Sequence, residues 1–189
     1  MLKVYPFSRS RAVSPDFQQL LRPHVNFLYR LAYRFTGVAA DAEDLVQDTL
    51  LKLLPRVHEM RALDEIRPWL ARVLYRQFVD FVRKRGRTPS DPAQTGGDEV
   101  LEEMSSDDGG PEELADRELQ YEQVLQALDR LGTEHRVVVA MHDIEGYSLE
   151  EMEEILETPI GTLKSRLHRA RNRLRAVLAM EPVSGNQRV

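Results

Sequence analysis

The chain has 189 residues, of which 42% are hydrophobic and 30% charged, and its formal net charge is −5. This length suits one compact domain or two small ones. It contains no cysteine, which excludes disulfides, thiolate catalysis and cysteine-ligated zinc and fits a reducing cytosol. The N-terminal stretch has no apolar core of signal-peptide length, and no run reaches the roughly 18 apolar residues of a membrane span. We therefore expect a soluble cytoplasmic protein without membrane insertion.

The negative charge is concentrated in one segment. Residues 88–116 hold ten acidic residues and no lysine or arginine, so the formal charge of the remaining chain is +5. The segment is also rich in proline, glycine and serine, and like-charge repulsion with low hydrophobicity disfavours folding on its own. We predict an all-α protein in which an acidic flexible linker, 88–116, joins two small helical domains at 14–87 and 117–179. The flexible N-terminus is then 1–13 and the tail 180–189.

Proline and glycine punctuate the N-terminal domain. Pro15 follows Ser14 as at a helix start, and Pro23 should break or kink that helix before its apolar pattern continues to Gly37. Asp41 is expected to be the N-cap of a second helix, where its charge suits the helix dipole. The predicted elements are a helix interrupted at Pro23, a helix from Asp41 to about Val57, a loop at 58–68, and a helix from about Trp69 to Arg85.

The helix predicted from Trp69 is amphipathic. At 100° per residue its apolar side combines Leu70, Val73, Leu74, Phe78 and Phe81. The opposite side carries Arg72, Arg76 and Arg83, flanked by Lys84. Such a stripe is either a solvated face or a surface for nucleic acid. The aromatic residues Trp69 and Tyr75 beside it favour nucleic acid, because rings next to cations suit unpaired bases.

The C-terminal domain is predicted to contain four helices. Gly146 ends the second, Ser148 with Glu151 forms a capping box for the third, and Thr158 with Pro159 is typical of the start of the fourth. A short helix, a tight turn and a longer basic helix form a helix-turn-helix pattern. The predicted ranges are 117–131, 134–145, 149–156 and 159–179.

The last helix separates its apolar and basic residues. The stretch "TPIGTLKSRLHRARNRLR" (158–175) has six lysine or arginine residues and no acid. Its apolar face should comprise Leu163, Leu167, Ala170, Leu174, Val177 and Leu178. The opposite arc comprises Lys164, Ser165, His168, Arg169, Asn172 and Arg175, with Arg166, Arg171 and Arg173 on the flanks. Cations suit phosphates and short donors suit base edges, so we favour DNA over a solvated helix or a coiled-coil arm.

Two sets of motifs resemble one family in its own order. The stretch "LDRLGTEHRVVVAMHDIEGYSLEEMEEILETPIGTLKSRLHRARNRLR" resembles region 4 of bacterial extracytoplasmic-function (ECF) sigma factors of the sigma-70 family. "DAEDLVQDTLLKL" resembles their region 2.2, and "RPWLARVLYRQFVDFVRKRGR" resembles regions 2.3 and 2.4. The resemblance covers about residues 14–87 and 117–179. It implies a transcription initiation factor that guides core RNA polymerase to promoters.

The resemblance also implies partners and contact residues. Region 2 would bind the clamp helices of core polymerase through Asp44, Gln47 and Asp48. It would hold single-stranded −10 DNA through Arg61, Arg67, Trp69, Arg72, Arg76 and Arg83, with a flipped base received by the loop 60–68. Region 4 would touch the polymerase flap and bind the −35 duplex through Thr162, Lys164, Ser165, His168 and Arg169. The family further implies control by an anti-sigma factor and a linker directed to the RNA exit path.

The chain departs from the family pattern at several positions. The family usually has a small residue in place of Glu153, glycine in place of Glu157, proline in place of Gly132 and asparagine in place of Arg76. Glu153 is expected where two helices pack closely. Acids beside DNA repel phosphates, so we expect weaker −35 binding or a tilted recognition helix. The change at Arg76 bears on −10 specificity.

Two other classes of protein are the alternatives to a sigma factor. An enzyme is disfavoured because the sequence has no phosphate-binding glycine loop, no cysteine and no cluster at metal-ligand spacing, so no catalytic residue, metal or cofactor is predicted. A stand-alone helix-turn-helix regulator would explain the last helix. Such a regulator needs neither the Asp44/Gln47/Asp48 surface nor the −10 stripe, and it should bind duplex DNA well without polymerase.

Overall fold

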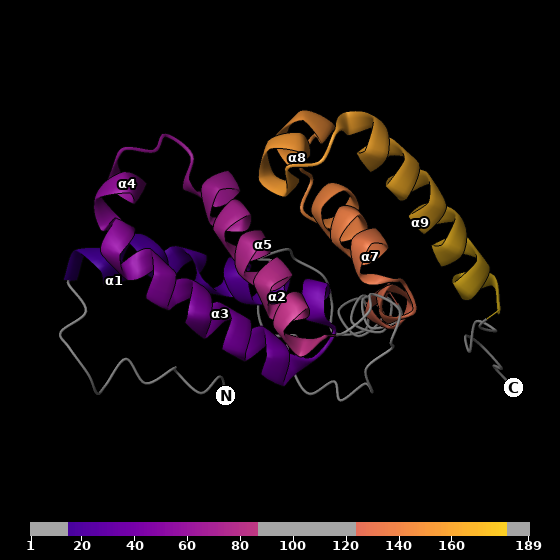
Figure 1. Cartoon of the computed structure of the whole chain (residues 1–189), viewed down its shortest axis with the longest axis horizontal. Coiled ribbons are helices and arrows are strands. Elements are labelled where there is room, and N and C mark those ends of the chain that lie inside the picture. Colours follow the sequence, from indigo (N-terminus) through magenta and orange to yellow (C-terminus); the bar gives the residue numbers. More distant parts are fainter. Residues whose placement is uncertain (1–14, 87–123, 181–189) are drawn as a thin grey trace, which may run out of the picture.

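The computed structural model describes residues 15–86 and 124–180, which form an N-terminal unit and a C-terminal unit (Figure 1). Within these two ranges the regular elements are all helical, which confirms the predicted fold class. The predicted linker at 88–116 lies outside the described residues, as do residues 1–13 and all of the tail except Met180. No helix in the described ranges is both long and apolar enough to cross a membrane.

The first helices follow the proline and glycine pattern. Helix α1 spans Pro15–Leu21, a 3₁₀ turn spans Arg22–His24, and α2 spans Val25–Thr36. The interruption predicted at Pro23 is confirmed. Gly37 ends α2 with a left-handed backbone (φ 71°), and its amide donates to the Tyr33 carbonyl oxygen at 2.7 Å.

Helix α3 corrects two predictions. It spans Ala39–Leu53, with Val38 and not Asp41 at the N-cap. The Asp41 carboxylate is instead buried and accepts two hydrogen bonds from Arg85, at 2.5 and 2.6 Å, because a distant guanidinium is a stronger partner than a backbone amide. The helix also ends early, at the 3₁₀ turn Leu54–Arg56, since Pro55 cannot continue it.

The predicted loop at 58–68 is shorter than expected. Helix α4 spans Val57–Arg61, and α5 spans Ile66–Arg85, so only residues 62–65 connect them. Pro68 is tolerated in the first turn of α5, where backbone amides have no intrahelical partner. The predicted apolar side of α5 is buried at Leu70, Val73, Leu74 and Phe78 and partly buried at Phe81.

The C-terminal unit begins with helical residues 124–129, the described part of the helix predicted at 117–131. Helix α7 spans Thr133–Val139 and continues as a π-helical segment, Ala140–Ile144, which matches the helix predicted at 134–145. Helix α8 spans Leu149–Leu156 and α9 spans Ile160–Met180. The capping box is confirmed: the Glu151 amide donates to Ser148 Oγ at 3.1 Å, and the Ser148 amide donates to Glu151 Oε2 at 2.7 Å.

The two units share a hydrophobic core. Helix α5 packs along α8, and α2 packs against α7 (Figure 1), and the buried apolar side chains of both units form one cluster. Tyr147 is buried in this cluster, and burial raises the pKa of its phenol to about 12. Removal of this apolar surface from water is what favours the joined arrangement.

Buried polar contacts set the register between the units. Arg34 of α2 forms an ion pair with Glu145, and their side chains are only 5% and 11% exposed. Nearby, Gly37 lies under the Arg136–Asp129 ion pair, where the two charged groups are 3.6 Å apart. A Cβ atom on Gly37 would overlap Nη1 of Arg136 and Oδ1 of Asp129. A side chain at residue 37 would therefore be strained by the backbone conformation and would have to displace the ends of the Arg136 and Asp129 side chains.

The variants Gly37→Ala and Gly86→Ala separate the effect of the backbone conformation from the effect of the neighbouring unit. Both glycines have positive φ, but a Cβ atom on Gly86 has no heavy atom within 4 Å. We expect Gly86→Ala to lower the free energy of unfolding by about 1 kcal/mol through backbone strain alone. Gly37→Ala should cost about 2–4 kcal/mol, because overpacking adds to the strain. Urea unfolding measures both values, and equal losses would contradict the close contact between the units.

Candidate nucleic-acid and polymerase interfaces

Helix α9 is anchored by its apolar face. Leu163, Leu167 and Ala170 are buried against the rest of the C-terminal unit, and Leu174 and Val177 are half-buried. The prediction that Leu178 belongs to this face is wrong, since Leu178 is 43% exposed. The last turn of α9 extends past the buried core, so the row of buried apolar side chains ends before this turn.

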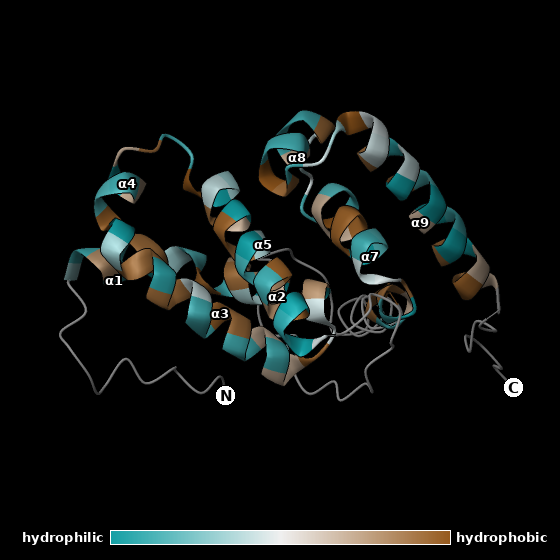
Figure 2. Ribbon diagram, in the orientation of Figure 1, coloured by the Kyte–Doolittle hydropathy of each residue, from teal (hydrophilic) through white to brown (hydrophobic). Residues whose placement is uncertain are grey.

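The opposite arc of α9 points away from both units. Thr162, Lys164, His168 and Arg169 are exposed and Ser165 is half-buried, so the five residues predicted for −35 DNA share one accessible face. Figure 2 shows this helix as largely hydrophilic on its outer side. A cationic helix face of this kind can meet the phosphates and base edges of a major groove.

Polar contacts along this arc are local. Ser165 Oγ donates to the Thr162 carbonyl oxygen at 2.9 Å. Asn172 contacts His168 Nε2 at 3.1 Å and accepts a hydrogen bond from Arg175 at 3.0 Å. These bonds order the side chains along the face while leaving the amino groups and guanidinium groups of Lys164 and Arg169 exposed to solvent.

The start of α9 is capped by an unexpected residue. Thr158 was predicted as N-cap, but its hydroxyl donates to the Leu156 carbonyl oxygen at 3.0 Å. Glu153 supplies the cap, because its Oε1 accepts a hydrogen bond from the Ile160 amide at 3.1 Å. The expectation that Glu153 lies between tightly packed helices is also wrong, since its side chain is exposed. Its carboxylate suits the positive end of the α9 dipole.

The flanking arginines of α9 hold the helix in place. Arg171 forms an ion pair with Asp143, whose pKa is held below its ordinary value chiefly by that hydrogen bond and further by His142. Arg166 pairs with Glu134 at 2.9 Å. These contacts tie α9 to α7 and to the π-helical segment. Pairs of this kind join separate elements, so helical spacing alone did not reveal them.

The exposed face of α3 carries the three residues predicted to bind polymerase. Asp44, Gln47 and Asp48 are exposed on successive turns. Leu51 follows one turn later and is 64% exposed, the most exposed of the large apolar side chains in the described ranges. Leu51 therefore lies on the same exposed side of α3 as the three predicted residues. The i, i+3 and i+4 spacing of Leu51 from Asp48 and Gln47 could have identified it from the sequence.

The residues predicted for −10 DNA lie at the end of α4, where Arg61 is, and at the start and along the outer face of α5. Trp69 is half-buried, and the Arg56 guanidinium lies 4.6 Å from its ring centroid. Glu59 fixes Arg56 through two hydrogen bonds at 2.9 and 2.6 Å. Arg67 lies over Phe27, at 4.7 Å, and Arg61 pairs with Asp16 at 2.6 Å. Sequence reasoning missed Arg56 and Glu59 because both belong to a segment predicted to be helix end or loop.

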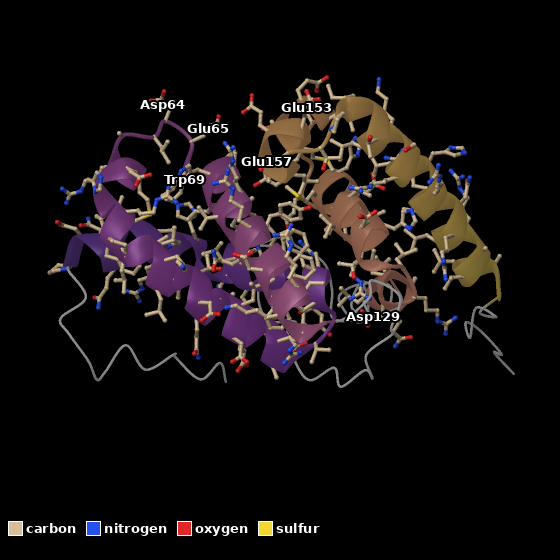
Figure 3. The ribbon with its side chains drawn as sticks, viewed as in Figure 1. Asp64, Glu65, Trp69, Asp129, Glu153 and Glu157 are labelled. Carbon is tan, nitrogen blue, oxygen red and sulfur yellow. The ribbon has the colours of Figure 1, made fainter. Side chains whose placement is uncertain are left out.

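The middle of this basic stripe meets the C-terminal unit. Glu157, directly after α8, accepts hydrogen bonds from Arg72, at 3.1 Å, and from Arg76 (Figure 3). These two hydrogen bonds, with Arg76 the stronger, lower the pKa of the Glu157 carboxyl. Arg83 is exposed farther along α5 and lies 4.0 Å from Asp80.

Comparison with known proteins matches both units. The family model for sigma-70 region 2 matches residues 20–88, and that for sigma-70 region 4 matches residues 121–174. The ECF RNA polymerase sigma factor SigM of Mycobacterium tuberculosis is 32% identical over 165 residues, which cover 86% of this chain and 76% of SigM. This chain is an ECF sigma factor of the sigma-70 family.

Two further relatives agree with this assignment. SigE, an ECF sigma factor of Mycolicibacterium smegmatis, is 35% identical over 93% of this chain, which spans 66% of the length of SigE. The solved structure of the sigma factor RpoE of Bartonella quintana, in complex with the anti-sigma factor NepR, has a TM-score of 0.65 and 29% identity. That match covers 89% of this chain and all of RpoE.

Membership of the family decides the broad class of function. ECF sigma factors are transcription initiation factors and not enzymes, so the sequence-based exclusion of an enzyme is confirmed. The N-terminal unit of this sigma factor corresponds to region 2 and the C-terminal unit to region 4. The residue sets for polymerase, −10 and −35 contacts stay predictions.

The cap on the recognition helix of this sigma factor is testable. We expect Glu153→Ala to lower the free energy of unfolding by about 1 kcal/mol, the usual loss when a helix N-cap is removed. Glu153→Gln should retain most of the stability, since the amide oxygen still accepts from Ile160. Glu154→Ala is the matched control on the same exposed face. Amide hydrogen exchange at Ile160 is the direct readout, and unchanged exchange in Glu153→Ala would contradict the assignment.

Proposed function

We propose that this sigma factor binds core RNA polymerase and directs it to promoters through three separate surfaces. Helix α3 contacts the clamp helices, the basic side of α5 holds the −10 strand, and α9 enters the −35 major groove. The observation that carries the proposal is the exposed basic arc of α9 opposite a buried apolar spine. The match of residues 121–174 to sigma-70 region 4, which includes most of this helix, supports the proposal.

The −35 surface would combine phosphate and base contacts. Lys164 and Arg169 are exposed cations that reach phosphates or guanine edges. Thr162, Ser165 and His168 lie near the start of the helix, the part of a recognition helix that enters the groove. Glu153 accepts a hydrogen bond from the Ile160 amide at this end of α9, so its charge lies against the positive end of the helix dipole.

The −10 surface would use aromatic stacking beside cations. Trp69 offers a half-buried ring that Arg56 contacts. Positive charge would come from Arg72, Arg76 and Arg83 on the basic side of α5, and from Arg61 and Arg67 near its start. Residues 62–65 form the short connection next to Trp69, with Asp64 and Glu65 exposed (Figure 3). A flipped base would lie at this connection, where the stacking surface and the backbone meet.

Regulation by a protein partner is part of the proposal. The match to RpoE covers 89% of this chain, and the structure of RpoE was solved with the anti-sigma factor NepR. We expect an anti-sigma factor to restrain this protein, in the cytoplasm, as well. The acidic segment 88–116 would run towards the RNA exit path of polymerase, where carboxylates suit a channel that accommodates RNA.

The stand-alone regulator is the weaker alternative. It accounts for the helix-turn-helix but does not explain why residues 20–88 match sigma-70 region 2.

Transcription with purified core polymerase tests the function. The full chain should direct run-off transcription from a subset of a randomised promoter library, and duplex DNA binding without polymerase should be weak. Asp48→Lys should weaken binding to core polymerase at least about tenfold, because it reverses a charge at the centre of the α3 surface. Glu150→Lys makes the same charge change on α8 and should leave core binding intact. Strong specific duplex binding with no initiation would support the stand-alone regulator.

Arg169 and Arg173 provide a matched pair for the −35 surface. Both are exposed arginines of α9, but Arg169 lies in the predicted arc and Arg173 lies on its flank. Arg169→Ala should weaken promoter binding by the holoenzyme by about 1–3 kcal/mol through a lost base or phosphate contact. Arg173→Ala should cost less. Equal losses in a filter-binding titration would mean that α9 acts only as a general electrostatic surface.

A further inference from the structure

One carboxylate oxygen joins the two units at the basic side of α5. Glu157 Oε1 accepts from Nη2 of Arg72 and from Nη2 of Arg76, which lie one helical turn apart. An anionic oxygen between two guanidinium groups is also how arginines hold a phosphate. The internal carboxylate therefore occupies the position that a nucleic-acid backbone would take on this surface.

The backbone of Glu157 indicates that its side chain matters. Among the described residues it is the one non-glycine residue with positive φ, at φ 51° and ψ 41°. Glycine adopts this helix-ending conformation without strain, and the family pattern has glycine at this turn. A glutamate here adds strain and gains the contacts to Arg72 and Arg76. Strain of this kind is typical of positions with a role beyond the fold.

The contact of Glu157 with Arg72 and Arg76 is reversible. The side chains of Arg72, Arg76 and Glu157 are 42%, 54% and 56% exposed, so water and salt weaken the pairing. None of the described residues accepts a hydrogen bond from Arg72 Nε, which is buried. A ligand with more acceptor oxygens than a single carboxylate could satisfy this donor as well. Opening the contact to bind such a ligand would thus lose little and add a hydrogen bond.

The joined arrangement affects the two DNA surfaces unequally. Glu157 covers the centre of the basic side of α5, while the arc of α9 points to solvent. The buried Arg34–Glu145 pair holds the units in register elsewhere along their contact. The Glu157 contact therefore occupies the predicted −10 surface and leaves the outer side chains of α9 uncovered.

We propose that Glu157 is an intramolecular latch, which occupies Arg72 and Arg76 in the free protein and is displaced by the single-stranded −10 DNA. The proposal rests on the proposed function, because it takes the basic side of α5 as the −10 surface. The latch prevents premature binding of single-stranded nucleic acid by the free factor.

Binding of a single-stranded probe to the full chain tests the latch. A fluorescein-labelled 20-nucleotide oligodeoxythymidylate is titrated by fluorescence anisotropy at low salt. Glu157→Gln, which keeps the size of the side chain, should tighten binding about three- to tenfold relative to wild type, the range expected from releasing two exposed ion pairs. Glu157→Gly should tighten it similarly, and without backbone strain its fold should be at least as stable as that of wild type.

Glu154→Gln is the matched control. It removes one negative charge from the same helix, and among the described residues no ion pair involves Glu154. It should tighten binding less than twofold. Equal effects of Glu154→Gln and Glu157→Gln would overturn the latch, since net charge alone would then explain both. High salt should reduce the difference between Glu157→Gln and wild type, and a difference that persists unchanged in high salt would also overturn it.

A second pair of variants separates the latch from the proposed function. Combined Arg72→Gln and Arg76→Gln should weaken probe binding, and adding Glu157→Gln to them should then have no more effect than Glu154→Gln. If the two arginine changes leave probe binding unaltered, the −10 assignment of this surface fails and the latch with it. If they weaken binding but Glu157→Gln alone does not tighten it, the latch fails and the −10 assignment stands.

Discussion

Helix α5 buries one side against α2 and α3 and lies along α8 on another, so a single helix joins the cores of two units. Its remaining surface must carry the basic residues predicted for −10 DNA. The buried side and the basic side share the surface of one helix. Residues at the boundary between the two sides therefore belong to both. Arg72 and Arg76 lie at that boundary, which explains why the neighbouring unit can reach them through Glu157.

Local patterns predicted much of the fold. The apolar faces of α5 and α9, the interruption at Pro23 and the Ser148–Glu151 capping box all depend on residues a few positions apart. The errors in the predicted N-caps came from contacts outside the local pattern of the helix. Asp41 was predicted to be an N-cap, but its carboxylate accepts a hydrogen bond from Arg85, 44 residues later in the chain. Thr158 was likewise a plausible cap, but Glu153 reached the Ile160 amide from the preceding helix.

The candidate site shows the same division. Helical spacing and the family resemblance placed the arc of α9 and the exposed face of α3, and the structure presents both to solvent. Neither source indicated that Arg56 would lie over Trp69, that Arg166 and Arg171 would anchor α9, or that Glu157 would join Arg72 and Arg76. Each of these pairs depends on how separate helices pack, and packing is set by the whole core.

The π-helical segment Ala140–Ile144 has a consequence for how this sequence can change. Its wider turn accommodates one more residue than an α-helical turn would, and the Glu145 amide closes it by donating to the Ala140 carbonyl oxygen at 3.0 Å. Deletion of one residue here would restore α-helical geometry, and the residues after it would keep their direction because the wide turn already absorbs the extra residue. Glu145 would still point towards Arg34. The turn can thus lose its extra residue in evolution while the two units stay joined and the two helices predicted to contact DNA keep their sequences.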